Sequence, residues 1–261
     1  MNLPQILFFD FDNTLVDNKT HTIPTSAINA LKKVVSNGYK IAIASGRSYP
    51  LLKLTGVCEL VTWSGYCLNN GQVVMDGNES FIHHHTLSHE KILESIEIAK
   101  KLGFNLFFSS LGNDFLMEEP NEYVYEAHNF FNEPIPQIGI YTNQAIDKIL
   151  VYAPKGYDYT PFKAIEGLST FISVSTYADL ATTGISKHSA IQELCLALNL
   201  PTAYAAFGDS QNDMEMLKGA KISVAMGNAD PKLKDIAMMV TDDVDQDGIY
   251  HALLKLGYIE K

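Results

Sequence analysis

The chain has 261 residues, of which 46% are hydrophobic and 19% are charged, and its formal net charge is −11. This length suits one large domain or two modest ones, and the composition excludes a disordered chain. The excess of acidic residues argues against a nucleic-acid partner, which would bind a basic surface, and against anionic membrane surfaces. A small anionic substrate is compatible with it, because one local cation can outweigh the overall field.

Cysteine usage and the start of the chain predict a reduced, cytoplasmic protein. The cysteines, Cys58, Cys67 and Cys195, are odd in number and far apart, so we expect neither a disulfide framework nor a zinc site and predict buried, inert thiols. No basic segment opens the chain, and Asp10 and Asp12 interrupt its first apolar run, so no signal peptide is expected. No apolar run approaches the roughly 18 residues of a membrane span.

The first third of the chain predicts a strand, a helix and a second strand. The apolar run at 5–9 is typical of a buried strand. Thr25 or Ser26 can cap a helix that ends at Asn37, and residues 39–44 form a second apolar run. A strand–helix–strand unit implies a parallel sheet.

The last third repeats this alternation, so the predicted fold class is α/β with a mostly parallel sheet. Polar residues follow the strands, at the sheet edge where ligands bind in such folds. The predicted elements are a helix at 186–200, a strand at 203–207, a short helix at 213–220, a strand at 221–225, a helix at 231–237, a strand at 238–241 and a helix near 246–256.

The middle of the chain is more aromatic and alternates more in polarity. Residues 81–88 and 148–154 predict strands with one exposed face, and residues 171–184 offer one or two more. An amphipathic helix follows Ser88, a plausible cap. We interpret residues 78–183 as an α+β domain inserted into the first, so that 1–77 and 184–261 build one core.

Four polar clusters carry the chemistry: DFDNT at 10–14, SGR at 45–47, Lys187, and GDSQND at 208–213. In a parallel sheet the clusters that follow strands converge at one edge. The site would then hold four carboxylates, one ammonium and one small hydroxyl. Carboxylates packed together repel each other unless a cation lies among them, and oxygen ligands of this kind suit Mg²⁺.

The sequence resembles the haloacid dehalogenase (HAD) superfamily of phosphohydrolases, in the Cof-type subgroup with a large α/β cap (type C2B). The resemblance covers nearly the whole chain and implies a Rossmann-like, three-layer core with an inserted α+β cap. It rests on ILFFDFDNTLV (6–16), IAIASGRS (41–48), Asn70-Gly71, Lys187, FGDSQNDMEML (207–217), VAMGNA (224–229) and VTDDVDQDGI (240–249).

The resemblance implies an acid–base and nucleophile pair. Asp10 would attack phosphorus and become an aspartyl phosphate. Asp12 would protonate the leaving alcohol and then activate water. Lys187 would neutralise phosphate charge and orient Asp10.

The resemblance also implies binding residues for phosphate and for Mg²⁺. The phosphate would be held by Ser45, Gly46, Lys187 and Asn212. The metal would be held by Asp10, the main-chain carbonyl of Asp12, Asp209 and, through water, Asp213.

Two departures from the family pattern are visible. Asn13 stands where glycine is commoner, and Asn tolerates the turn conformations that glycine takes. Ser45 stands where threonine is commoner and keeps the hydroxyl. Asp12 favours phosphomonoester chemistry, since relatives that cleave carbon–halogen bonds lack an aspartate there.

Other residues are less informative. Arg47 is a candidate contact for substrate or for the inserted domain, and Asn70 is a candidate substrate contact. The run His83-His84-His85 alternates faces in a strand, so all three rings cannot converge on one ion.

The leading hypothesis is a Mg²⁺-dependent phosphatase for a small phosphorylated metabolite, cytoplasmic, and a monomer or weak homodimer. The alternatives are a phosphotransferase or phosphomutase using the same intermediate, and a catalytically silent metal-binding regulatory module. A dinucleotide-binding protein ranks low because no G-x-G-x-x-G follows the first strand.

Overall fold

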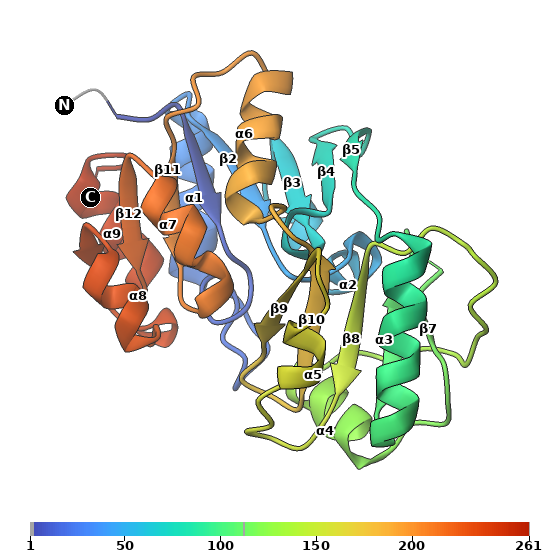
Figure 1. The fold of residues 1–261 in the computed structure, drawn as a ribbon. Coiled ribbons are helices and arrows are strands. Elements are labelled where there is room, and N and C mark those ends of the chain that lie inside the picture. The colour runs from blue at the N-terminus through green and yellow to red at the C-terminus, as the bar shows by residue number, and fades with distance from the viewer. Residues whose placement is uncertain (1–2, 112, 261) are drawn as a thin grey trace. The chain divides into compact units, whose positions relative to one another are not determined.

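The computed structural model describes residues 3–111 and 113–260, which divide into two compact units (Figure 1). The first unit runs up to Arg47, from Leu52 to His83, and from Ser186 onward. The second comprises Ser48–Leu51 and His84–Ile185. The insertion at residues 78–183 stays a prediction about domain organisation. No helix of the described residues is both long and apolar enough to cross a membrane.

The first unit is built on an eight-stranded, mostly parallel sheet, which confirms the predicted α/β class. Neighbouring strands from β13 to β3 pair in parallel, and β4 pairs antiparallel with β3. In spatial order the strands are β13 (Met239–Val240), β12 (Ile222–Ala225), β11 (Ala205–Gly208), β1 (Ile6–Phe9), β2 (Lys40–Ala44), β3 (Gly65–Leu68), β4 (Val73–Asp76) and β5 (Phe81–His84).

The strand order reverses at β1, and this reversal positions the site. From β1 the chain passes to β2 on one side, whereas β11 occupies the other side, as the blue and orange strands in Figure 1 show. All four residues of β1 and of β11 are buried, as continuous apolar runs in parallel sheets usually are. Beyond the last residue of β1, the N–H of Asp10 still donates to the carbonyl of Phe207, at 2.9 Å. A reversal of this kind opens a crevice at the carboxyl ends of the strands.

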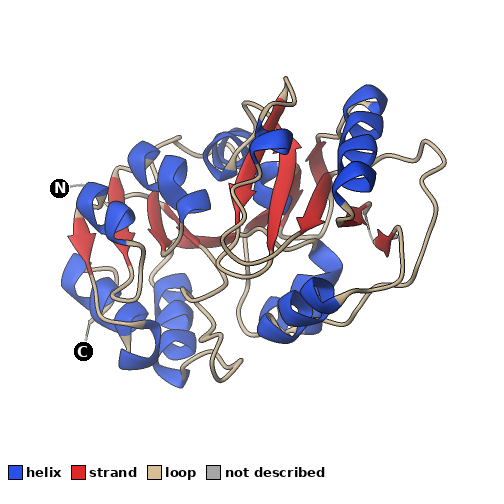
Figure 2. Ribbon diagram, turned by 60° about the horizontal axis from the view of Figure 1, so that its bottom comes forward, coloured by secondary structure: helices blue, strands red, loops and turns tan. Residues whose placement is uncertain are grey.

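Helices cover the sheet of the first unit on both sides (Figure 2). α1 packs against α9, and α6 packs against α7. The helices are α1 (Thr25–Ser36), α6 (Lys187–Ala197), α7 (Met214–Gly219), α8 (Pro231–Ile236) and α9 (Gly248–Leu256), with 3₁₀ turns η1 (Val57–Glu59), η2 (Asn69–Gly71), η3 (Gln211–Asp213) and η4 (Val244–Gln246).

The predicted cap of α1 is wrong. The helix begins at Thr25 after Pro24, and no side chain caps it. The hydroxyl of Ser26 donates to the Asp247 carboxylate instead, a partner 221 residues away in the sequence. The predicted end of the helix is confirmed, because Asn37 is its C-cap.

The second unit contains a five-stranded antiparallel sheet. Ser88 caps the first helix of this unit through the N–H of Lys91, as predicted. The strands in spatial order are β7 (Phe115–Leu116), β6 (Asn105–Ser109), β8 (Lys148–Tyr152), β10 (Tyr177–Thr182) and β9 (Leu168–Ile172). The helices are α3 (His89–Leu102), α4 (Glu122–Phe130) and α5 (Thr160–Lys163), and the short α2 (Tyr49–Leu54) spans the boundary of the two units.

The prediction that residues 148–154 form a strand is confirmed, but the exposed face expected for it is wrong. All five residues of β8 are buried. Ile149 and Val151 lie in an apolar cluster with residues of α3 and α5, whereas Leu150 and Tyr152 cluster with Val124 of α4. A strand with a helix on each face has no face left for solvent.

Candidate active site

Lys187 is the charged centre of the site. It is the first residue of α6, which Ser186 and Ser189 cap reciprocally. A cation in the first turn opposes the helix dipole, so helix stability does not account for a lysine at this position. The buried ammonium donates to Asp10 Oδ1 at 2.6 Å and to Asp213 Oδ1 at 2.7 Å. Lys187 therefore joins the carboxylates that follow β1 and β11.

Asp213 is fixed by three donors. Besides Lys187, which binds Oδ1, the N–H groups of Asp209 and Ser210 donate to Oδ2, at 3.0 and 3.1 Å. A Cβ added at Gly208 would lie 2.6 Å from Asp213 Cγ, closer than real Cβ contacts come. The glycine at the end of β11 therefore lets Asp213 fold back against the strand.

The electrostatics of this cluster show an excess of negative charge. Burial raises the pKa of Asp10 to about 7, the charge of Asp213 adds to the rise, and Lys187 only partly offsets it. Burial and the charge of Asp10 raise the pKa of Asp209. Burial lowers the pKa of Lys187, but the two carboxylates that it contacts outweigh this effect and raise it. Three buried carboxyl groups thus face one ammonium.

The same carboxyl groups fit a divalent cation. Asp10, Asp209 and Asp213 each offer an oxygen, and these oxygens all lie within 4.8 Å of one another. Hard oxygen donors and uncompensated negative charge are what Mg²⁺ prefers. The side chain of Asp12, in contrast, points to a different partner.

Ser45 and Gly46 form a loop directly after β2. The N–H of Ser45 donates to the carbonyl of Cys67 (2.8 Å), and its Oγ accepts from the N–H of Arg47 (3.1 Å). A Cβ added at Gly46 would lie 3.2 Å from Asn70 Oδ1, so the loop and Asn70 are closely packed. The loop carries the Ser45 hydroxyl, whose proton is a donor suited to an anion.

A turn of three residues in the left-handed conformation packs against this loop. Asn69, Asn70 and Gly71 have φ values of 51°, 57° and 103° in succession. The N–H of Asn70 donates to the carbonyl of Ser45 at 3.1 Å, and a Cβ added at Gly71 would lie 2.2 Å from the carbonyl oxygen of Ser186. Only glycine fits at that position. The turn fixes both the loop after β2 and the start of α6.

Asn212 joins the turn rather than the lysine in the contacts that the structure shows. Its Nδ2 donates to Asn70 Oδ1 at 2.9 Å, and its Oδ1 accepts from the Ser210 hydroxyl at 2.7 Å. Its predicted role, to support Lys187 or phosphate, stays a prediction. Asn70 is buried beneath the loop, and its contact with substrate likewise stays a prediction.

Asp12 is paired with Arg47. The guanidinium donates from Nε to Oδ2 at 2.9 Å and from Nη2 to Oδ1 at 2.8 Å, a two-pronged ion pair. Sequence reasoning left the partner of Arg47 open between substrate and the inserted domain. The structure pairs it with the predicted acid–base residue.

The structure adds two hydroxyl residues that sequence reasoning missed. Thr14 Oγ1 donates to Asp209 Oδ1 at 3.4 Å, and Ser210 binds Asn212. Both lie inside the quoted polar clusters, where the carboxylates, Asn13 and Asn212 were considered but not the hydroxyls. Asn13 has φ 55°, so this asparagine adopts the left-handed conformation that we expected it to tolerate.

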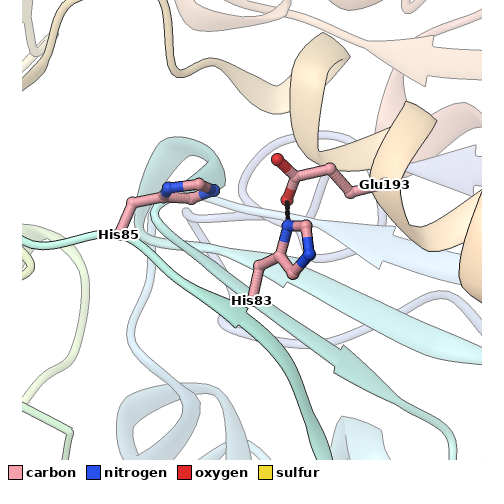
Figure 3. Close-up of side chains that lie close together, drawn as sticks. All are labelled: His83, His85 and Glu193. Carbon is pink, nitrogen blue, oxygen red and sulfur yellow. Dashed lines mark ion pairs between the residues drawn. The ribbon is translucent and has the colours of Figure 1, made fainter.

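The histidine run and the cysteines lie outside this constellation of residues. His83 forms an ion pair with Glu193 of α6 in the first unit, with 2.7 Å between Nδ1 and Oε2 (Figure 3). His84 contacts Asp147 in the second unit, so neighbouring rings have different partners, as alternation along a strand requires. All three thiols are free, but Cys58 is only partly buried, contrary to our prediction.

Buried carboxylates around one lysine, placed after parallel strands beside a hydroxyl-bearing loop, are typical of enzymes that transfer phosphoryl groups on a core of helices around a parallel sheet. The chain belongs to the haloacid dehalogenase-like hydrolase family, which matches it over residues 7–253. The family resemblance of the sequence is thus confirmed.

Two relatives of similar length illustrate this membership. The protein YkrA of Bacillus subtilis (strain 168), named provisionally as a phosphatase, is 28% identical over 266 residues, covering 98% of this chain and 99% of that one. The phosphoglycolate phosphatase of Archaeoglobus fulgidus is 26% identical over 265 residues, covering 98% of each.

Solved structures agree. The phosphatase BT1666 of Bacteroides thetaiotaomicron has a TM-score of 0.88 at 28% identity, covering 98% of this chain and 96% of that one. The HAD subclass IIB sugar phosphatase BT4131 has a TM-score of 0.88 at 29% identity, covering 97% and 99%. The chain is therefore an enzyme, a hydrolase related throughout its length to phosphatases.

Proposed function

We propose that this enzyme is a Mg²⁺-dependent phosphatase that hydrolyses a small phosphomonoester through an aspartyl phosphate on Asp10. The observation that carries the proposal is the contact between Lys187 Nζ and Asp10 Oδ1, at 2.6 Å, inside a cluster of buried carboxyl groups. An ammonium that neutralises an attacking carboxylate and an incoming phosphate suits phosphoryl transfer, which depends on positioning and charge.

The proposed function has two half-reactions. In the first, a carboxylate oxygen of Asp10 forms a bond to phosphorus while the bond to the alcohol oxygen breaks, and Asp12 gives that oxygen a proton. In the second, Asp12 takes a proton from water, whose oxygen attacks phosphorus and releases Asp10 and inorganic phosphate. Ser45 and Gly46 would bind the phosphate oxygens through the loop after β2.

Mg²⁺ bound by Asp10, Asp209 and the Asp12 carbonyl would neutralise phosphate charge and hold the group in line. Asp213 would act on a water ligand of the metal and on Lys187, which it contacts. The raised pKa values of Asp10 and Asp209 support a cation at this place, since burial without one leaves their charges uncompensated.

The substrate class is a small phosphorylated metabolite. Support comes from the relatives, one named a sugar phosphatase and another a phosphoglycolate phosphatase, whose substrates are all small phosphomonoesters. A reduced, cytoplasmic location agrees with the three free cysteines. A monomer or weak homodimer stays our expectation.

The test is phosphate release from a panel of sugar phosphates, phosphoglycolate, nucleotide monophosphates and p-nitrophenyl phosphate, with Mg²⁺ or with chelator. We expect release with the metal and none from Asp10→Asn, whereas Asp235→Asn, on the exposed surface of α8, keeps it. Phosphate transfer to a second sugar hydroxyl without release would indicate a phosphotransferase. Neither release nor transfer would favour a regulatory module.

A further inference from the structure

Arg47 is the only arginine among the 261 residues of the chain. Its side chain is 8% exposed, whereas that of its partner Asp12 is 21% exposed. Both oxygens of Asp12 accept from the guanidinium, Oδ2 from Nε at 2.9 Å and Oδ1 from Nη2 at 2.8 Å. Such a fork fixes the plane of a carboxylate as well as its position.

The fork occupies only part of what Asp12 can bind. A carboxylate has about four lone-pair positions, and the fork uses one on each oxygen. The second position on each oxygen is left for a further donor, and the 21% exposure of the Asp12 side chain leaves the carboxylate accessible. Arg47 therefore orients Asp12 without blocking it.

Arg47 is itself held at several points. The guanidinium lies over the ring of Phe11, with 5.1 Å to the ring centroid, and that ring is 1% exposed. Its N–H donates to Ser45 Oγ and its carbonyl accepts from the N–H of Asn69, each at 3.1 Å. The phosphate-binding loop proposed above and the left-handed turn thus anchor the main chain from which the fork extends.

We infer that Arg47 is a positioning residue that holds the Asp12 carboxylate in the orientation from which it transfers protons. This inference rests on the proposed function, in which Asp12 is the acid and base. It assigns the one arginine to the catalytic step rather than to substrate binding. Lysine cannot replace it, because an ammonium has no planar pair of donors to match a carboxylate.

The first test uses leaving groups of different quality. Proton donation matters for an alkyl phosphate and little for p-nitrophenyl phosphate, whose leaving group departs without it. We expect Arg47→Ala and Arg47→Lys to lower the single-turnover rate of alcohol release from the best alkyl phosphate of the panel by about 10²-fold, as misplaced groups do. The single-turnover rate of p-nitrophenol release should fall much less, and the substrate concentration at half-maximal rate should stay nearly unchanged for both. Single turnovers are compared because kcat also contains hydrolysis of the aspartyl phosphate, in which Asp12 is the base for both substrates.

Chemical rescue separates positioning from a structural role. Added methylguanidine should restore part of the kcat of Arg47→Ala for the alkyl phosphate. It should restore none in the double variant Arg47→Ala/Asp12→Ala, which lacks the partner carboxylate. A rise in KM with unchanged kcat would overturn the inference and assign Arg47 to substrate. An equal loss on both substrates, without rescue, would overturn it in favour of a structural role.

A measurement without turnover keeps the two proposals distinguishable. Because the chain has one arginine, its Nε–H gives a single, unambiguous NMR signal. We expect this signal to exchange slowly with water and to move toward the position of unpaired arginine in Asp12→Ala. An Nε–H that is unaffected by Asp12→Ala would overturn the inference. Failure of the wild-type enzyme to release phosphate, with the NMR result as expected, would refute the proposed function alone.

Discussion

Lys187 Nζ lies 2.6 Å from Asp10 Oδ1 although 177 residues separate the two in the sequence. The contact joins the end of β1 to the first turn of α6, and both side chains are buried. Lys187 is the ammonium that balances Asp10 and Asp213, which both lie within 2.7 Å of it. We therefore expect removal of this one charge to affect folding and catalysis together.

We expect Lys187→Met to abolish most activity and to destabilise the protein. A preorganised donor at a developing charge contributes about 10²–10³ in kcat, so phosphate release should fall at least that far. Two buried carboxylates lose their partner, which typically costs about 3–5 kcal/mol. Urea unfolding at pH 8 without metal measures the second effect.

Asp10→Asn combined with Lys187→Met provides the control for this interpretation. It removes one of the uncompensated carboxylates, so it should recover part of the lost free energy of unfolding but none of the activity. If the double variant is no more stable than Lys187→Met, charge imbalance is not the cause of the destabilisation.

The raised pKa of Asp10 predicts an unusual pH dependence of stability without metal. Burial raises this pKa from 3.8 to about 7, so the folded protein holds a proton that the unfolded chain has already released. Stability from this group should therefore fall as pH rises from 3.8 to about 7 and change no further above that. Bound Mg²⁺ should compensate the charge, and its stabilising effect should be larger at pH 8 than at pH 6.

Thermal unfolding at pH 6 and pH 8, with Mg²⁺ or with chelator, measures this dependence. Asp10→Asn is the matched variant, because its side chain has nearly the same shape and does not titrate. Without metal it should gain stability over the wild type at both pH values, and by about 1.4 kcal/mol more at pH 8 than at pH 6, because one more pH unit of the Asp10 titration lies between pH 6 and the pKa of about 7. An equal gain at both pH values would contradict the predicted titration of Asp10.

Asp12 offers a third prediction. Asp12→Ala should slow alkyl phosphates by about 10²–10⁴-fold, the usual contribution of a general acid, because their leaving groups need a proton. Aryl phosphates should be slowed less in the first half-reaction. Comparing the single-turnover rates of alcohol release from p-nitrophenyl phosphate and a sugar phosphate checks this, and equal losses on both would remove Asp12 from the acid role.

Local patterns in the sequence were sufficient to predict five of the eight strands of the first sheet, namely β13, β12, β11, β1 and β2. They did not predict β3 and β4, and the residues of β5 were expected in the inserted domain. The apolar runs at 5–9 and 203–207 correspond to β1 and β11, and their buried, parallel pairing follows from strands that alternate with helices. The polar clusters after these strands converge because parallel strands end at the same edge. Distant packing could not be predicted in this way. The predicted cap of α1 was wrong because Ser26 binds Asp247. The predicted exposed face of β8 was wrong because α4 covers it.

The sequence was sufficient to name the residues of the site, but not to predict every pair of residues that would be in contact. Asp10 and Lys187 lie together as the family resemblance implied. Arg47 pairs with Asp12 across 35 residues of sequence, and the main chain of Arg47 is held by the N–H of Asn69. Nothing local in the sequence specifies either contact. Short motifs identify donors and acceptors, whereas the fold selects which of them meet.

Gly208 allows a test of how closely Asp213 must approach β11. A Cβ at Gly208 would lie 2.6 Å from Asp213 Cγ, so Gly208→Ala should push this carboxylate away from Lys187 and from the N–H of Asp209. Since a displacement of about 1 Å in a site can cost 10²-fold, we expect a fall in kcat of that order.

Gly65→Ala is the matched control, because a Cβ there would lie 2.7 Å from the Leu194 side chain and from the Met75 carbonyl. Both glycines lie in buried strands of the same sheet, and both substitutions should lower the free energy of unfolding. Only Gly208 contacts a site carboxylate. At a temperature where both variants are folded by circular dichroism, Gly65→Ala should keep most of its kcat. Equal losses in the two variants would show that crowding in the sheet, rather than the position of Asp213, lowers activity.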